Sequence, residues 1–124
     1  MTRTPMRSDQ PRVFLIDDGR HAAYLYQFEP PVTPEDVAFS VDQLANSGID
    51  TLLLSVCLEG GAVTYDSRVA PKWGDNVDMW THSVWYRAAR NLKQMLDDGH
   101  DPLQLVIDRC RERGLWFYAG SWVN

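Results

Sequence analysis

The sequence carries little basic charge and no long apolar run, and both absences limit its partners. Its 124 residues include 12 lysines and arginines against 17 aspartates and glutamates, for a formal net charge of −5 at pH 7. Nucleic acid and anionic membranes bind clustered basic surfaces, so neither is expected as the main partner. No apolar stretch approaches the roughly 20 residues that span a bilayer, and the polar residues 1–10 lack the apolar core of a secretory signal. A cytoplasmic location is therefore expected.

Cysteines are scarce, and the common cofactor and metal motifs are missing. Cys57 and Cys110 have no metal-ligand spacing to each other or to a histidine, which favours two buried free thiols and leaves a disulfide or a catalytic thiol as alternatives. The sequence contains no G-x-G-x-x-G after a strand, no G-x-x-x-x-G-K-[ST], no G-x-S-x-G and no H-E-x-x-H. No cofactor and no metal is predicted from these patterns.

What the chain does contain is one junction that occurs twice. Residues 45–54 and 111–118 each run from a polar helix end, through Gly48 or Gly114, directly into an apolar strand. Such junctions lead a helix back to a parallel sheet, and the apolar residues 13–16 supply a strand ahead of the first helix. This order predicts an α/β fold with right-handed crossovers. We expect parallel strands near residues 13–17, 51–57 and 115–120, adjacent in that order.

Helix-start signals mark the elements between these strands. Thr33 has the character of an N-cap, with Pro34 at the first helical position and Asp36 in a variant capping box, and Asp101 with Pro102 repeats the arrangement. Helices are expected near residues 34–46 and 81–96 and from residue 102 onward, each with an apolar stripe at helical spacing. Residues 58–80 form a long aromatic insertion. A connection of this length is usually functional or disordered.

The carboxyl ends of the predicted strands are the expected ligand site, because loops converge there in parallel α/β folds. This rule selects three groups of candidate substrate-binding residues, one after each strand: Asp17, Asp18 and His21; Glu59, Tyr65, Arg68 and Trp73; and Ser121, Trp122 and Asn124. A glycosidase normally holds two carboxyl groups roughly 5 to 10 Å apart across the scissile bond. No such pair can be assigned here, so the catalytic residues stay unassigned.

Plainer structural interpretations remain open for the acidic candidates. Asp17 and Asp18 point to opposite sides of an extended chain, so one can cap the turn at Gly19 while the other is solvated. The alternatives are binding of a substrate hydroxyl group and a metal site within residues 17–21. Glu59 precedes two glycines. It either binds substrate or is a solvated surface residue.

Trp73 and Trp80 lie in the insertion without a helix or strand period. Their flat apolar faces would suit stacking on a sugar ring, since a pyranose presents a patch of CH groups bordered by hydroxyl groups. The alternative is that the insertion folds its aromatic side chains onto the helix that follows, where Trp85 is expected in the core.

A resemblance to a known family is carried by residues 28–35 (FEPPVTPE), 48–51 (GIDT), 65–69 (YDSRV), 91–92 (NL), 99–103 (GHDPL) and 113–115 (RGL). These segments resemble the N-terminal part of bacterial glycoside-hydrolase-like proteins, which are predicted (β/α)8 barrels and mostly uncharacterised. The resemblance covers about residues 12–124, and its motifs are structural junctions more than catalytic signatures.

The resemblance implies that the chain forms the first three βα units of a (β/α)8 (TIM) barrel that acts on or binds carbohydrate. In related barrels the segment here occupied by residues 121–124 carries polar groups facing the substrate cleft. Their acid and nucleophile usually lie on the fourth and later strands. The resemblance therefore implies that the catalytic pair lies beyond Asn124 and that the 124-residue chain alone is inactive.

Two functions from different classes follow. In the first, a flexible tail of residues 1–11 precedes a partial barrel domain of residues 12–124 that supplies carbohydrate-binding groups. In the second, the chain is a non-catalytic α/β module that binds a small polar ligand or a protein partner. A partial barrel should leave apolar strand surface uncovered and be able to self-associate through its open sheet edge. The strands concerned contain Leu52, Leu54, Val56, Phe117 and Ala119.

Overall fold

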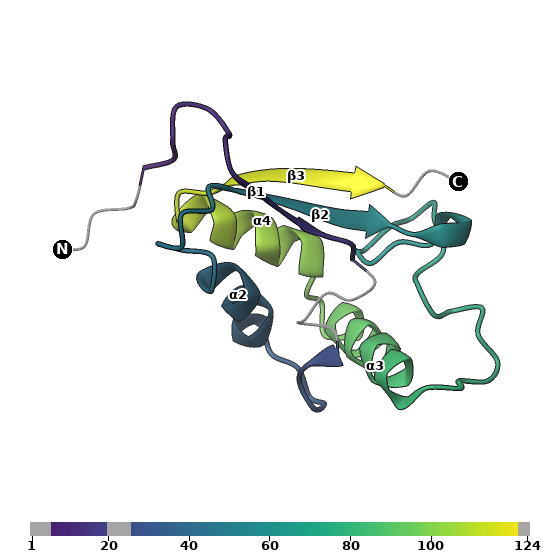
Figure 1. Cartoon of the computed structure of the whole chain (residues 1–124). Coiled ribbons are helices and arrows are strands. Elements are labelled where there is room, and N and C mark those ends of the chain that lie inside the picture. Colours follow the sequence, from purple (N-terminus) through teal and green to yellow (C-terminus); the bar gives the residue numbers. More distant parts are fainter. Residues whose placement is uncertain (1–5, 20–25, 122–124) are drawn as a thin grey trace.

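The computed structural model describes residues 6–19 and 26–121 (Figure 1). Its elements are β1 (Phe14–Asp17), α2 (Pro34–Asp42), β2 (Thr51–Cys57), a 3₁₀ turn (Glu59–Gly61), α3 (Ser83–Asp97), α4 (Pro102–Glu112) and β3 (Trp116–Ser121). The predicted order of strands and helices is confirmed. His21, Trp122 and Asn124, which were predicted to bind substrate, lie outside the described residues.

The three strands form one parallel sheet in the order β1-β2-β3. Thr51 at the start of the central strand pairs with Phe14 on one side and Trp116 on the other. The three strands therefore start in register with one another. This confirms the predicted order and direction. A barrel and an open sheet can both begin with three such strands, so the fold established here is α/β with a parallel sheet.

Helices α2, α3 and α4 lie on the same side of this sheet (Figure 1). Side chains from the helices meet those of β2 in a single core, because each helix turns an apolar stripe inward. The core contains Val37, Val41, Leu44, Leu52, Leu54, Val56, Leu92, Met95, Val106, Cys110 and Leu115, none more than 8% exposed.

The other face of the sheet is open at its two outer strands, whereas Thr51 and Ser55 of the central strand are buried there. Phe14 is 45% exposed, Ile16 69% and Tyr118 43%. The rings of Phe14 and Tyr118 stack across the sheet with their centroids 6.1 Å apart. Apolar strand surface is therefore open, as expected for a partial barrel.

The residues named for these strands lie mostly on the covered side. Leu52, Leu54 and Val56 are buried under the helices, and Phe117 packs against the same core. Side chains alternate between the two faces of a strand, so the uncovered positions are neighbours of these residues in sequence. Of the five residues named, Ala119 is exposed.

Both predicted helix starts are confirmed. The hydroxyl of Thr33 accepts a hydrogen bond from the N–H of Asp36 at 3.2 Å, and the Asp36 carboxylate accepts one from the N–H of Thr33 at 2.9 Å. The Asp101 carboxylate accepts from the N–H of Leu103 at 3.0 Å, ahead of α4. These side chains satisfy N–H groups that have no partner inside their helix.

The two glycine junctions turn differently. Gly114 directly follows the C-cap of α4 with a φ of 70°, as predicted for the left-handed position. Helix α2 ends at Asp42, earlier than expected, and the chain turns through Asn46 with a φ of 64° and Gly48 with a φ of 91°. After Asp42 the N–H groups of Leu44 and Ala45 donate to carbonyls three residues back, at 2.9 and 3.2 Å, so the chain tightens into turns. The weak helix formers Asn46, Ser47 and Gly48 follow and do not resume the helix.

Asp50 fixes the start of β1 against β2. Its carboxylate accepts hydrogen bonds from the Thr51 hydroxyl at 2.7 Å and from the backbone N–H groups of Arg12 at 3.1 Å and Val13 at 3.0 Å. Hydrogen bonds to the charged form, first that of Thr51, hold the pKa of Asp50 below its ordinary value of 3.8.

Trp116 binds the segment that precedes β1. The Arg7 guanidinium lies 3.9 Å from the centroid of the Trp116 ring, and the indole N–H donates to the carbonyl of Ser8 at 3.0 Å. This end of the sheet is therefore tied to residues 7 and 8.

Both cysteines are free thiols, as predicted. Cys110 is buried in the core, and burial raises the pKa of its thiol to about 12. Cys57 is only half-buried at the end of β2. Among the described residues, no helix is both long and apolar enough to cross a membrane.

Candidate functional site

The turn after β1 lies on the carboxyl end of β2. The N–H of Gly19 donates to the Asp17 carboxylate at 2.9 Å, as the capping interpretation expected. Gly19 has a φ of 76°, and a Cβ there would stand 1.9 Å from the carbonyl oxygen of Ser55. Only glycine allows so close an approach. Asp17 and Asp18 are both half-buried, at the edge of the sheet where substrate contacts were predicted.

Ser55 and Gly120 lie beside this turn and were missed by sequence reasoning. They pair across β2 and β3, and Ser55 is 7% exposed. A Cβ on Gly120 would stand 2.9 Å from a methyl carbon of Leu53 and 3.5 Å from the Ser55 hydroxyl oxygen. A small polar residue inside an apolar strand was the signal that could have found Ser55.

The second predicted group does not converge at the strand ends. Glu59 lies in the 3₁₀ turn, Tyr65 packs against the hydrophobic core and Arg68 is exposed. Trp73 lies farther along the insertion, against α3. Ser121 of the third group is exposed at the end of β3.

Backbone hydrogen bonds give the insertion a defined path. Val63 bridges Cys57 and Lys72, and the N–H of Trp73 donates to the Val63 carbonyl at 2.8 Å. Val63 and Thr64 are each 2% exposed. The insertion is thus anchored to the end of β2, and it carries Trp73 from there to α3.

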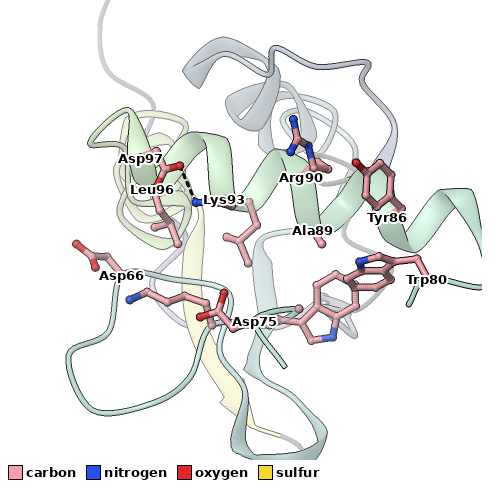
Figure 2. Close-up of a pocket in the computed structure, with 13 residues that line it drawn as sticks. Asp66, Asp75, Trp80, Tyr86, Ala89, Arg90, Lys93, Leu96 and Asp97 are labelled. Carbon is pink, nitrogen blue, oxygen red and sulfur yellow. Dashed lines mark hydrogen bonds and ion pairs between the residues drawn. The ribbon is translucent and has the colours of Figure 1, made fainter. Parts of the chain in front are cut away.

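A pocket of about 410 Å³ lies between the insertion and α3 (Figure 2). Its volume is within the range of small-molecule sites, roughly 300 to 1,000 Å³. One wall comes from the insertion and the other from α3. The lining residues are Asp66, Lys72, Trp73, Gly74, Asp75 and Trp80 on the first wall and Tyr86, Ala89, Arg90, Leu92, Lys93, Leu96 and Asp97 on the second.

Aromatic side chains hold one another in place at this pocket. The ring centroids of Trp73 and Trp80 are 5.8 Å apart, those of Trp73 and Trp85 6.3 Å, and those of Trp80 and Tyr86 6.4 Å. The last two pairs meet edge to face, a geometry that aromatic quadrupoles favour. The insertion does fold its aromatic side chains onto α3, and this packing is what places Trp73 and Trp80 on the pocket wall.

Two small residues set the spacing of the walls. Gly74 has a φ of 98°, and a Cβ there would stand 3.0 Å from the Cβ of Ala89 and 3.4 Å from the Trp80 ring. The insertion can therefore approach α3 closely at Gly74. A larger side chain at Ala89 would project into the pocket.

Charged side chains line the rest of the pocket. The insertion contributes two carboxylates, Asp66 and Asp75, and one amine, Lys72, whose Nζ donates to the carbonyl of Ser67 at 3.3 Å. Helix α3 contributes Arg90, and the ion pair of Lys93 with Asp97 at 3.0 Å.

The direction of these groups can be followed in Figure 2. The Asp75 carboxylate lies on the insertion wall apart from the Trp80 ring, whereas the Arg90 guanidinium projects away from the insertion. Neither Asp66 nor Asp75 forms an ion pair with another residue in the described ranges.

Sequence reasoning found the aromatic part of this pocket and missed its charged part. Trp73 was a predicted binding residue, and Trp80 was proposed to stack on a sugar. Asp66 and Asp75 were overlooked because loop carboxylates are usually solvated. The polar residues of α3 that follow one face at helical spacing, from Tyr86 to Asp97, were the available signal.

A scan of protein-family models and a search of curated proteins found no match to this chain. The resemblance to glycoside-hydrolase-like proteins therefore rests on the sequence segments quoted above.

Proposed function

We propose that this chain binds carbohydrate and that a sugar ring enters the pocket between the insertion and α3. The observation that carries the proposal is the pair of indoles, Trp73 and Trp80, on the wall of a pocket whose rim is charged. A pyranose combines an apolar patch of CH groups with a border of hydroxyl groups. An indole face suits the patch, and carboxylates and amines suit the hydroxyl groups.

The geometry supports specific contacts for such a ring. Asp75 accepts hydrogen bonds from sugar hydroxyl groups, and Lys72, which precedes it in the same turn, donates to hydroxyl oxygens. The indoles are already fixed by their edge-to-face contacts, so little side-chain entropy is lost when a ligand binds.

We further propose that the sheet is the opening of a (β/α)8 barrel of the glycoside-hydrolase-like type. Three features support this: strands that neighbour one another in chain order, helices on one side, and apolar residues such as Ile16 and Tyr118 open on the other side. Barrel strands bury their second face against opposing strands. In a barrel, the turn at residues 17–19, Ser55 and Ser121 would border the mouth and add hydroxyl-binding groups.

Isothermal titration calorimetry of the 124-residue protein with a panel of neutral and charged oligosaccharides tests the binding proposal. Trp80→Ala removes one stacking face, and Ala89→Leu fills the pocket while leaving both indoles in place. Each is expected to weaken binding by about tenfold or more, which corresponds to about 1.4 kcal/mol.

The matched control is Trp116→Phe, which removes an indole far from the pocket and should bind like the original protein. The proposal is wrong if no oligosaccharide of the panel binds, or if Trp80→Ala and Ala89→Leu bind as well as the control. Circular dichroism of each variant establishes that it is folded.

A further inference from the structure

We infer that the sugar unit held in this pocket carries an ammonium group, so that amino sugars bind better than neutral or acidic ones. This inference rests on the proposed carbohydrate-binding function and extends it to a class of ligand. It follows from which of the six charged side chains in the pocket already have partners and which do not.

Two of the three cationic side chains of the pocket already have a hydrogen-bond or ion-pair partner, and the third points away from the insertion. Lys93 is paired with Asp97 at 3.0 Å, and Lys72 donates to the Ser67 carbonyl at 3.3 Å. Arg90 projects from the rim away from the insertion (Figure 2). An acidic sugar would therefore have to displace an existing partner before it gained a cation.

The two carboxylates of the insertion wall, in contrast, have no ion-pair partner among the described residues. Asp66 and Asp75 have no ion pair within the described part of the chain, and both line the same pocket as Trp73 and Trp80. An acidic ligand would meet like charge at these two carboxylates. An ammonium group would find an unpaired carboxylate in a pocket that also offers an indole face.

Long-range electrostatics also favour a cationic ligand over an anionic one. The chain has a formal net charge of −5, so its overall field attracts cations and repels anions. Asp66 and Asp75 are exposed, and solvent and salt therefore moderate the gain. The expected preference is about three- to tenfold in affinity.

Oligosaccharides whose sugar units are cationic, neutral or anionic test the inference. The probes are tetramers of β-1,4-linked glucosamine, of its N-acetylated form, and of a β-linked glucuronic acid, titrated at a pH where the amines are protonated. The glucosamine tetramer should bind about three- to tenfold more tightly than the N-acetylated one, and the acidic tetramer most weakly. The preference should decline as salt is raised.

Asp75→Asn is the matching change in the protein, since it removes the charge and keeps the shape. It should abolish the preference for the glucosamine tetramer and cause a smaller loss of affinity for the N-acetylated tetramer, because the amide keeps one oxygen that accepts hydrogen bonds from hydroxyl groups. Asp78→Asn removes one charge from the same insertion outside the pocket, and it should keep the preference. Equal binding of the two glucosamine tetramers, or tightest binding of the acidic one, overturns this inference and leaves the proposed function standing. Failure of every oligosaccharide to bind overturns both.

Discussion

The two faces of the sheet are built from similar residues and have opposite surroundings. Leu54 on the helix side is 1% exposed, whereas Ile16 on the open side is 69% exposed. Both are aliphatic residues within parallel strands. Their difference comes from the helices, which lie on one side of the sheet (Figure 1).

The two sides of the sheet differ in what they can do: one stabilises the fold, and the other offers surface for contacts. The helix side contains the closely packed core, and the pocket with its fixed indoles lies at the margin of that core. The open side presents apolar side chains, and a shallower hollow of about 360 Å³ is lined there by Leu15, Ile16, Asp17 and Asp18, without the aromatic rings of the first pocket. We therefore propose ligand binding on the helix side and further packing on the open side.

Truncation of one side chain on each face should give the largest contrast. Leu54→Ala leaves a cavity in the core and is expected to lower the free energy of unfolding by about 3 kcal/mol. Ile16→Ala, on the open face, should change it by about 0.5 kcal/mol or less in the monomer. Urea denaturation of dilute protein, followed by circular dichroism, measures both. Similar losses for the two variants under these conditions would mean that the open face is covered within the monomer.

The close approach of the β1 turn to β2 should give the next largest effect. Gly19→Ala places a Cβ against the Ser55 carbonyl at a φ of 76°, and we expect a loss of about 2 kcal/mol. Gly48→Ala is the control, because its φ is also positive but nothing lies within 4 Å, and it should cost about 1 kcal/mol. If Gly19→Ala is no worse than Gly48→Ala, the turn does not rest on β2.

The open face should also govern association. We propose that the 124-residue chain self-associates through this face, and that Ile16→Lys shifts it toward monomer in sedimentation velocity experiments, because a charge cannot be buried there without a partner. Val69→Lys changes a residue that is 96% exposed in the insertion and should have no effect. A chain that is monomeric at every concentration contradicts this proposal.

Acid should weaken the link between the N-terminal segment and the sheet by a smaller amount. The pKa of Asp50 is lowered in the folded state, mainly by the Thr51 hydroxyl, so its ionised form contributes stability above the unfolded pKa near 3.8. That contribution is lost as the pH falls through the folded value. The stability difference between the original protein and Asp50→Asn should therefore shrink between about pH 5 and pH 2. Asp78→Asn, at an exposed position, serves as the control, and a difference that stays constant with pH would contradict the assignment.

Local signals in the sequence were sufficient for most of the fold. The N-cap at Thr33, the turn at Gly114 and the apolar runs of the strands predicted the order and direction of the elements, because each depends on neighbouring residues. The end of α2 was placed too late, because Gln43, Leu44 and Ala45 are good helix formers and yet the chain already forms turns there.

The surface and the site depended on packing that no local pattern encodes. Which face of a uniformly apolar strand becomes buried is decided by where the helices dock, so the strand sequences alone did not say which residues would stay open. The pocket needs Gly74 against Ala89 and Trp73 against Trp85, contacts between segments that are separated in sequence. Only the tertiary structure brings them together.

The most direct test of the central claim is the response of the tryptophan indole N–H signals to a bound sugar. The chain has five tryptophans, whose resonances can be assigned by single substitutions in ¹⁵N-edited nuclear magnetic resonance spectra. With the oligosaccharide that binds best, the account predicts that the signals of Trp73 and Trp80 shift in proportion to occupancy while that of Trp116, on β3, stays unchanged. Shifts at Trp116 with Trp73 and Trp80 unaffected would place the ligand elsewhere and contradict the account.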